Sequence, residues 1–202
     1  MTPEFVLATA NPDKAREIAA ILAVSLPGVR VVPRPTDVGE VEETGDTLEE
    51  NARLKAQALA DAAGLPAVAD DTGLEVDALG GAPGVYSSRY AGEHATYADN
   101  VAKLLAALEG VDEGRRTARF ATVAIARWPD GREVVARGEV EGTIATHAAG
   151  DGGFGYDPIF VPGEGDGRTF AEMTPDEKHA VSHRGRAFRA LAEALLADGV
   201  TA

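Results

Sequence analysis

Short apolar segments alternate with signals for helix starts in the first half of this sequence, and this alternation constrains the fold more than any other feature. Residues 5–9 are a short apolar run, and Asn11 and Pro12 follow it almost at once. Asparagine caps the free N–H groups of a first helical turn, and proline suits the next position because its missing N–H costs nothing there. The pattern predicts a strand, then a helix to about Leu22, then a second strand over 29–32.

Similar signals recur further along the chain. Thr47 and Glu50 have the spacing of a capping box, which predicts a helix that ends at Gly64. A short strand over 67–69 is expected to end at the acidic pair that follows it. The glycines and prolines within 73–92 predict mostly irregular structure there.

The second half of the chain predicts a hairpin followed by closing helices. Two apolar segments flank the turn sequence Pro129-Asp130-Gly131. The expected elements are a helix over 97–108, hairpin strands over 119–128 and 133–140, and a helix that starts at Thr174, is interrupted at Ser182 and resumes over 186–196. Alternation, then a hairpin, then helices predicts an α/β fold with a mixed β-sheet, in a single domain over 1–202.

Composition excludes several classes of protein. The 202 residues include 19 basic and 33 acidic side chains, a net charge of −14. This balance argues against nonspecific nucleic-acid binding, which needs clustered Lys and Arg, but it allows a small anionic ligand in a local basic pocket. Cysteine is absent, which excludes disulfides, thiolate catalysis and Cys-bound metal centres. Without a signal-peptide pattern or a run of ~18 uncharged apolar residues, we expect a cytoplasmic protein that makes no membrane contact.

The segment from Thr9 to Lys14 is the first candidate for chemistry. A strand that runs straight into a helix presents free N–H groups and the positive end of the helix dipole, which suits a phosphate. Lys14 lies in the first helical turn, where a cation is unfavourable unless it faces an anion. The alternative is a capped helix with a solvated lysine. The glycine spacing of a P-loop is absent.

The acidic pair Asp70-Asp71 is the second candidate. Adjacent side chains on a strand point to opposite faces, so only one of the two carboxylates should face a given pocket. Carboxylates beside a glycine-rich loop suit Mg²⁺ that also binds substrate phosphates, whereas an Asx-turn at the strand exit is the alternative. Glu42-Glu43 is a second acidic pair that could supply another ligand.

Two further segments suit a planar base and its oxygens. Within Gly152–Pro158, glycines flank Phe154, so the backbone can approach a flat ligand while the ring stacks on it, a contact worth ~1–3 kcal/mol. A bulge with a core aromatic is the alternative. Lys178, His183 and Arg184 are donors suited to phosphate or carbonyl oxygens, although each alone is more often a surface charge.

Taken together, these segments resemble the inosine triphosphate pyrophosphatase family, whose motifs they match in order over residues 7–191. The matching segments are Thr9–Lys14, Glu42–Gly45, Ala69–Leu74, Gly80–Gly84, Gly152–Pro158 and Ser182–Gly185. The resemblance implies an elongated mixed β-sheet flanked by helices, two lobes with a central substrate cleft, and a homodimer. It also implies Mg²⁺-dependent hydrolysis of ITP, dITP and XTP to the monophosphate and pyrophosphate.

The resemblance also assigns roles to residues. Asp71 is expected to be the metal ligand and proton acceptor, with Glu42 as the second metal position, although the neighbouring Glu43 leaves that register open. Ala10 stands where many relatives have glycine, and Thr72 where serine is common. The expected substrate-binding residues are Thr9, Ala10, Asn11, Pro12, Asp13 and Lys14 for the triphosphate, Thr72, and Phe154, Gly155, Tyr156, Asp157, Lys178, His183 and Arg184 for the base.

Base selectivity has a simple physical basis in this interpretation. Hypoxanthine and xanthine carry a 6-oxo acceptor where adenine carries an amino donor, so donors such as Lys178 and Arg184 would be left unpaired by adenine. Three alternatives remain open: a pyrophosphatase for other nucleotides, a nucleotide-sensing module without turnover, and a structural oligomer.

Overall fold

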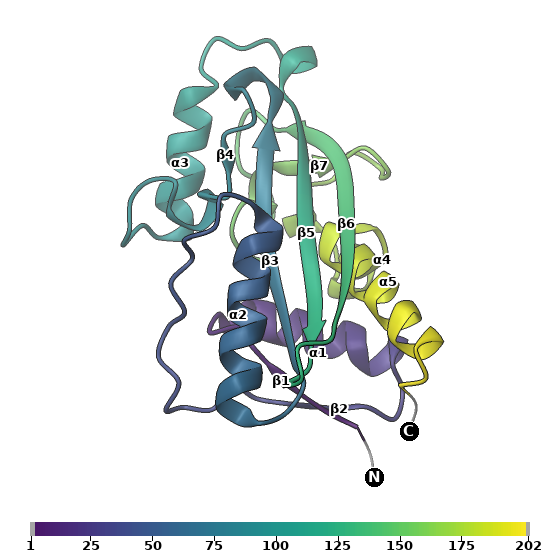
Figure 1. Cartoon of the computed structure of the whole chain (residues 1–202). Coiled ribbons are helices and arrows are strands. Elements are labelled where there is room, and N and C mark those ends of the chain that lie inside the picture. The colour runs from purple at the N-terminus through teal and green to yellow at the C-terminus, as the bar shows by residue number, and fades with distance from the viewer. Residues whose placement is uncertain (1–2, 201–202) are drawn as a thin grey trace. The chain divides into compact units, whose positions relative to one another are not determined.

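The computed structural model describes residues 3–200, whose strands form one seven-stranded sheet (Figure 1). The strand order is β2-β1-β3-β5-β6-β7, and β4 pairs with β3. The strands are β1 (Glu4–Leu7), β2 (Arg30–Val32), β3 (Ala67–Val76), β4 (Pro83–Gly84), β5 (Thr117–Arg127), β6 (Glu133–Ile144) and β7 (Phe160–Pro162). The α-helices are α1 (Pro12–Ser25), α2 (Leu48–Ala63), α3 (Tyr97–Ala107), α4 (Pro175–Val181) and α5 (His183–Ala197). Short 3₁₀ helices are η1 (Asp77–Leu79), η2 (Ser87–Arg89), η3 (Glu113–Arg115), η4 (Asp157–Ile159) and η5 (Phe170–Glu172).

The sheet is mixed, which confirms the predicted fold class. β1 pairs in parallel with β2 and with β3, whereas β3–β4 and β6–β7 are antiparallel pairs. The predicted hairpin is present, and its turn closes where the Trp128 N–H donates to the Arg132 carbonyl at 2.9 Å.

The chain packs as two compact units. Unit 1 contains the chain up to Asp71, then Thr122–Gly138, and the chain from Arg184 onward. Unit 2 contains Thr72–Ala121 and Glu139–His183. β3, β5 and β6 contribute residues to both units. The elongated sheet, the two lobes with a central cleft and the single domain over 1–202 stay predictions.

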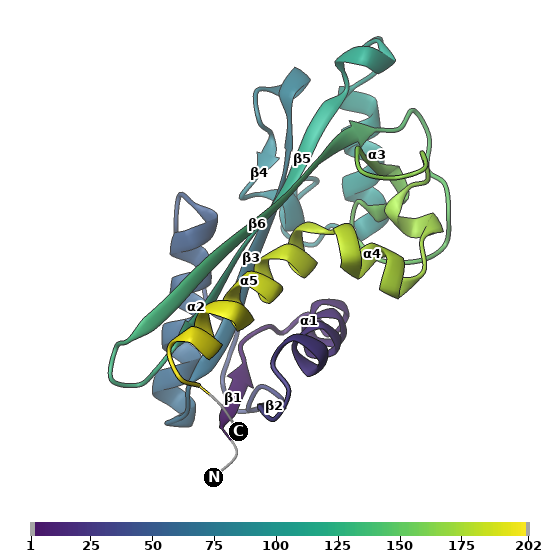
Figure 2. The ribbon, with the colours of Figure 1, turned by 90° about the vertical axis from the view of Figure 1, so that its right-hand side faces the viewer.

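Unit 1 is built on strands covered by helices on both faces. Figure 2 shows α1 and α5 on one face of its strands and α2 on the other. Local signals set these helices, because Asn11 caps α1 and Thr47 with Glu50 forms the expected capping box of α2. The core between β1, α1, β3, β5 and α5 contains Phe5, Leu7, Ile18, Ile21, Leu22, Leu26, Val68, Ala124, Ala126, Ala187, Phe188, Leu191, Ala192 and Leu195.

Unit 2 has its own core and a buried arginine that ties its segments together. Its core contains Leu74, Val76, Leu104, Leu108, Ala118, Phe120, Val140, Ile144, Tyr156, Ile159, Phe160 and Phe170. The Arg116 guanidinium donates to the carbonyls of Leu108, Ile144 and Ala145 at 2.9–3.0 Å. Because these donors are satisfied, the buried guanidinium joins the end of α3 to the end of β6 at little cost.

The largest difference from the sequence-based prediction is the length of β3. We expected a short strand ending at Asp70-Asp71, but β3 continues through both acids to Val76. Beyond the acids, Leu74 and Val76 are fully buried in the core of unit 2, and β4 pairs along this stretch. Packing of the alternating apolar residues therefore outweighs the turn-forming tendency of the Asp-Asp-Thr-Gly sequence.

The other differences are at element ends. α1 runs to Ser25, β2 begins at Arg30, α3 ends at Ala107, and the hairpin strands extend over 117–127 and 133–144. Thr174 and Glu177 form a capping box at the start of α4, and Ser182 ends that helix, as predicted, but α5 begins at His183 rather than at Arg186. Among residues 3–200, each helix is too short or too polar to cross a lipid bilayer.

Candidate active site

The start of α1 in unit 1 has the local geometry that the sequence predicts. Asn11 Oδ1 accepts hydrogen bonds from the backbone N–H groups of Asp13 (2.9 Å) and Lys14 (3.2 Å), and Thr9 Oγ1 accepts from the Asn11 N–H at 3.1 Å. These bonds fix the turn that connects β1 to α1. The segment 9–14 therefore has one defined backbone conformation at a helix N-terminus, where an anion is favoured.

Lys14 faces an anion, which is the condition that makes a lysine acceptable in a first helical turn. Its Nζ lies 3.4 Å from Oδ2 of Asp70, a carboxylate that is almost fully buried. Burial lowers the pKa of Lys14, and the charge of Asp70 offsets part of this effect. The same Asp70 oxygen is 3.5 Å from Nη2 of Arg184, whose Nη1 bonds Oε2 of Glu17 at 2.7 Å.

Asp71 has a different set of partners in unit 1. Its Oδ1 lies 2.8 Å from Nζ of Lys55, and Lys55 Nζ is also 2.8 Å from Oε1 of Glu43. Burial lowers the pKa of Lys55, but the charges of Asp71 and Glu43 outweigh it and raise that pKa overall. Burial raises the pKa of Asp71 against the attraction of Lys55 and Lys14. The adjacent carboxylates therefore have separate partners, as predicted for neighbours on a strand.

The Asp71 surroundings fit a hard divalent cation. Asp71 Oδ2 is buried and has no hydrogen-bond partner among the described residues, so it keeps capacity for a ligand. Within residues 3–200, no three Asp, Glu or His side chains gather closely enough to hold a metal on their own. One or two carboxylates completed by substrate phosphates is the usual arrangement for Mg²⁺.

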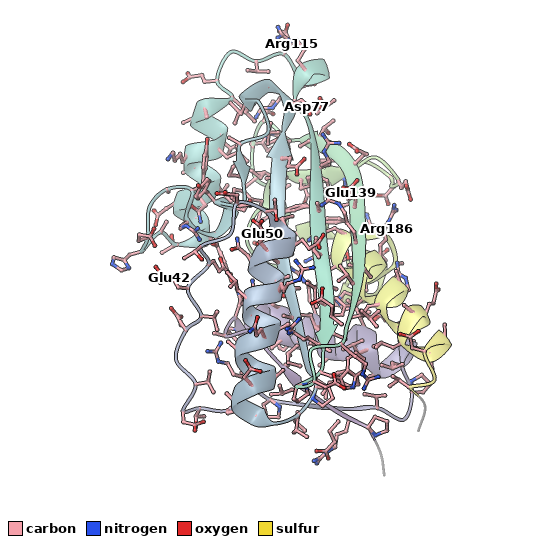
Figure 3. All side chains as sticks on the ribbon, in the orientation of Figure 1. Glu42, Glu50, Asp77, Arg115, Glu139 and Arg186 are labelled. Atoms are coloured by element: carbon pink, nitrogen blue, oxygen red, sulfur yellow. The ribbon has the colours of Figure 1, made fainter. Side chains whose placement is uncertain are left out.

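The second acidic residue at this place is Glu43. Glu42, which we expected as the second metal position, is exposed on the segment before α2 (Figure 3). Glu43 is half-buried and contacts Lys55. A backbone contact fixes this segment, because the Gly45 N–H donates to Oδ1 of the buried Asn51 at 2.7 Å. The structure brings Glu43, not Glu42, to the lysine that holds Asp71.

In unit 2, the glycine-rich segment places Phe154 beside a buried ion pair. Asp157 Oδ2 accepts from the Phe154 N–H at 2.7 Å and from Lys178 Nζ at 2.6 Å. The Lys178 ammonium lies 4.9 Å from the centroid of the Phe154 ring. Gly153 is required here, because it has φ +66° and a Cβ at this position would lie 2.0 Å from Asp157 Oδ2.

The remaining residues expected to bind the base are mostly buried. The Tyr156 hydroxyl donates to the Ser87 carbonyl at 2.9 Å, and burial raises its pKa. His183 is buried with its ring stacked on Phe120, at a centroid distance of 4.4 Å and an interplanar angle of 16°. Phe154 is half-buried and contacts the exposed Tyr97 ring at 5.8 Å. Of the side chains expected to bind the base, Phe154 is therefore the ring that stays partly accessible, whereas Tyr156 and His183 are buried.

The predicted site residues fall into two groups. Thr9–Lys14, Asp71 and Arg184 belong to unit 1, whereas Thr72, Phe154–Asp157, Lys178 and His183 belong to unit 2. We expected Arg184 to bind the base, but its guanidinium pairs with Glu17 and Asp70 in unit 1. We call Glu17, Glu43, Lys14, Lys55, Asp70, Asp71 and Arg184 the charged cluster, and Phe120, Phe154, Phe170, Asp157, Lys178 and His183 the aromatic cluster.

Sequence analysis did not single out Lys55 or Glu17, and it named Asp70 and Glu43 only as members of acidic pairs, without the partners that they have in the charged cluster. One signal could have found Lys55: the chain has only four lysines against fifteen arginines. Three of the four, Lys14, Lys55 and Lys178, pair with buried aspartates. The fourth, Lys103, is exposed on α3.

The fold and the two clusters define a class: a mixed-sheet α/β protein with buried acids and lysines suited to phosphates and a hard metal, and with an accessible aromatic ring. The chain belongs to the Ham1 family, whose model matches residues 5–194. This confirms the resemblance found in the sequence.

Individual relatives agree with the family assignment. The chain is 51% identical over 192 residues to a dITP/XTP pyrophosphatase of Streptomyces coelicolor, covering 93% of this chain and 94% of the relative. It is 52% identical over 197 residues to a dITP/XTP pyrophosphatase of Yersinia pseudotuberculosis, covering 95% and 98%. The solved HAM1 protein from Coxiella burnetii superposes with a TM-score of 0.86 at 43% identity, covering 96% of this chain and 99% of the other.

Proposed function

We propose that this chain hydrolyses purine nucleoside triphosphates with non-standard bases, namely ITP, dITP and XTP, to the nucleoside monophosphate and pyrophosphate in a Mg²⁺-dependent reaction. One observation carries the proposal: the buried Asp71, with an oxygen that has no hydrogen-bond partner in the described chain, lies beside Lys55 in the unit that also contains the capped start of α1. The names of the relatives from Streptomyces coelicolor and Yersinia pseudotuberculosis support the substrate class.

In this proposal the residues of unit 1 bind the triphosphate and orient water. A water molecule attacks the α-phosphorus, the bond from that phosphorus to the bridging oxygen breaks, and the electron pair leaves with pyrophosphate. Asp71 accepts a hydrogen bond from the water and takes its proton as the new P–O bond forms. Lys14 and the N–H groups at the start of α1 offset the negative charge that develops on the leaving group.

The metal would be held by Asp71 together with an acid of the 42–43 pair. When bound, Mg²⁺ supplies positive charge that neutralises phosphate oxygens and favours attack by water. Carboxylate oxygens are the donors that this ion prefers, so the residues present fit it.

The residues of unit 2 bind the base. Phe154 stacks on the purine, and Asp157 orients this ring by holding the Phe154 N–H and the Lys178 ammonium together. An ammonium has three donors, so in this proposal one N–H of Lys178 bonds Asp157 and another bonds the base oxygen. A 6-oxo purine offers an acceptor to such a donor, whereas adenine offers an amino group.

A product assay tests the proposal. The protein is incubated with Mg²⁺ and with ITP, dITP, XTP, ATP, GTP or UTP, and pyrophosphate and orthophosphate are measured separately. We expect pyrophosphate and monophosphate from ITP, dITP and XTP, at rates above those of the other three. Equal rates for all six would contradict the substrate class, and tight nucleotide binding without turnover would favour a sensing module.

A homodimer in the cytoplasm completes the proposal. The homodimer follows from the family resemblance and the cytoplasmic location from the sequence pattern at the start of the chain, and light scattering of the purified chain would test the first. A monomer mass at micromolar concentration would contradict the proposed homodimer.

A further inference from the structure

Lys55 occupies an unusual position in the charged cluster. Its ammonium lies at 2.8 Å from one oxygen of Asp71 and at 2.8 Å from one oxygen of Glu43, and only 11% of its side chain is exposed. Two carboxylates from different segments, the strand β3 and the segment before α2, thus converge on one cation supplied by α2.

This convergence does not depend on a bound metal. The Gly45 N–H bonds Asn51 Oδ1, and Asn51 precedes Lys55 by four residues on α2, so the two side chains lie on the same face of that helix. Gly45 allows this approach, because a Cβ at its position would lie 2.6 Å from Glu50 Cβ and 2.8 Å from Asn51 Oδ1. The backbone therefore holds Glu43 beside Lys55.

The position of the ammonium is one that suits a divalent cation. Mg²⁺ binds carboxylate oxygens at about 2.0–2.1 Å, so its replacement of the ammonium would need each carboxylate to move by only ~0.7 Å. Asp71 Oδ2 already lacks a hydrogen-bond partner among the described residues. A buried Asp71 beside a half-buried Glu43 would be costly without a neighbouring cation, so a cation is needed there at all times.

We infer that the Lys55 ammonium occupies a cation site between Asp71 and Glu43 in the free protein, and that a divalent cation replaces it there. Lysine and metal therefore compete for the same two carboxylates. The inference rests on the proposed function only in taking a divalent cation as the ligand. It explains why a lysine so firmly paired stands beside the acid proposed to bind metal.

A metal titration without nucleotide tests the inference. Mn²⁺ is added to the purified full chain, and free Mn²⁺ is measured by its electron paramagnetic resonance signal. Lys55→Met keeps most of the side-chain volume and removes the charge, so we expect Mn²⁺ to bind at least about tenfold more tightly than to the parent chain. Equal or weaker binding, or no binding to the variant, would overturn the inference.

Two matched variants separate the local effect from net charge. Lys103→Met removes the same charge from an exposed position on α3, and we expect its Mn²⁺ affinity to stay within about twofold of the parent chain. Lys55→Arg keeps a cation at the site and should not show the tighter binding. A gain in affinity for either variant equal to that of Lys55→Met would count against competition.

The two acids can be told apart in the same titration. In the Lys55→Met background, Glu43→Gln should remove most of the gain in Mn²⁺ affinity, whereas Glu42→Gln should keep it. The reverse result would overturn the position that we assign to the metal.

Thermal unfolding gives a readout that does not use activity. Lys55→Met should unfold at a lower temperature than the parent chain in EDTA, and Mn²⁺ should raise its midpoint more than it raises that of the parent. An equal rise in both proteins contradicts the inference. A chain that shows these metal effects but releases no pyrophosphate from ITP would instead contradict the proposed function.

Discussion

The charged cluster of unit 1 and the aromatic cluster of unit 2 hold buried charge in different ways. In the charged cluster, three cations are divided among four acids, and Asp70 alone lies within 3.5 Å of both Lys14 and Arg184. The aromatic cluster has one buried ion pair, Lys178 with Asp157, against the rings of Phe154 and Phe170.

The difference matches the two ends of the proposed substrate. A polyphosphate needs cations that are in place before it arrives, and these cations need internal acids because an unpaired buried charge is very unfavourable. A flat base needs a rigid ring and few charges. We therefore expect substitutions in the charged cluster to change activity through the charges that bind the triphosphate. Substitutions in the aromatic cluster should change activity through the fit of the base against the ring.

Asp71→Asn should have the largest effect. The amide keeps the shape of the side chain but removes the charge that binds metal and orients water, so we expect the turnover of ITP to fall by about 10²–10³ with little change in KM. Pyrophosphate release at varied ITP concentrations measures both constants.

Asp70→Asn is the matched control for this prediction. Asp70 pairs with Lys14 and Arg184 rather than with Lys55. Its loss should therefore raise KM more than it lowers turnover. If both variants lose turnover equally, the two acids do not have the separate roles that their partners indicate.

Lys14→Ala should have the next largest effect. A hydrogen bond to a charged group contributes about 1.5–3 kcal/mol, so KM for ITP should rise by about tenfold or more. Binding of inosine monophosphate should change much less, because the predicted contact is with the outer phosphates. Lys103→Ala, at an exposed site, serves as the control. An unaltered KM and rate would mean that Lys14 only balances Asp70.

Local signals explain which parts of this molecule could be predicted from its sequence. The caps at Asn11, Thr47 and Thr174 depend on side chains within three residues of the helix start, and all three were predicted. Sequence also showed that Lys14 needed an anion. It could not show that the anion is Asp70, because their pairing depends on how β1 and β3 associate.

Tertiary packing explains what the sequence-based prediction got wrong about β3 and left open about the partners of Asp71. The Ala-rich helix α2 has the pattern of an ordinary core helix, so the scarcity of lysines could draw attention to Lys55 but could not place it beside Asp71. The acids of β3 resembled a turn because buried aspartates are rare, and they are tolerated here only because Lys14 and Lys55 lie next to them. Which acid of the 42–43 pair points inward depends on the Gly45–Asn51 contact, which is also tertiary.

Phe154→Ala tests the shape-based half of the comparison. Stacking of a base on an aromatic ring contributes ~1–3 kcal/mol, so KM should rise by about tenfold. The rise should be similar for ITP, XTP and any other purine that is turned over, because stacking does not depend on the base edge. Phe154→Tyr keeps the ring and should stay close to the parent KM. A change confined to one base would show that Phe154 reads the edge.

The smallest predicted effect concerns the backbone that presents Phe154. Gly153 and Gly155 both have positive φ, +66° and +62°, but a Cβ on Gly153 would collide with the Asp157 carboxylate, whereas one on Gly155 meets nothing within 4 Å. Gly155→Ala should therefore cost about 1 kcal/mol of unfolding free energy from backbone strain alone. Gly153→Ala should cost about 1 kcal/mol more, because it also disturbs the oxygen that holds the Phe154 N–H and Lys178. Urea unfolding of the two variants measures the difference, and equal losses would mean that Asp157 moves freely and does not fix the ring.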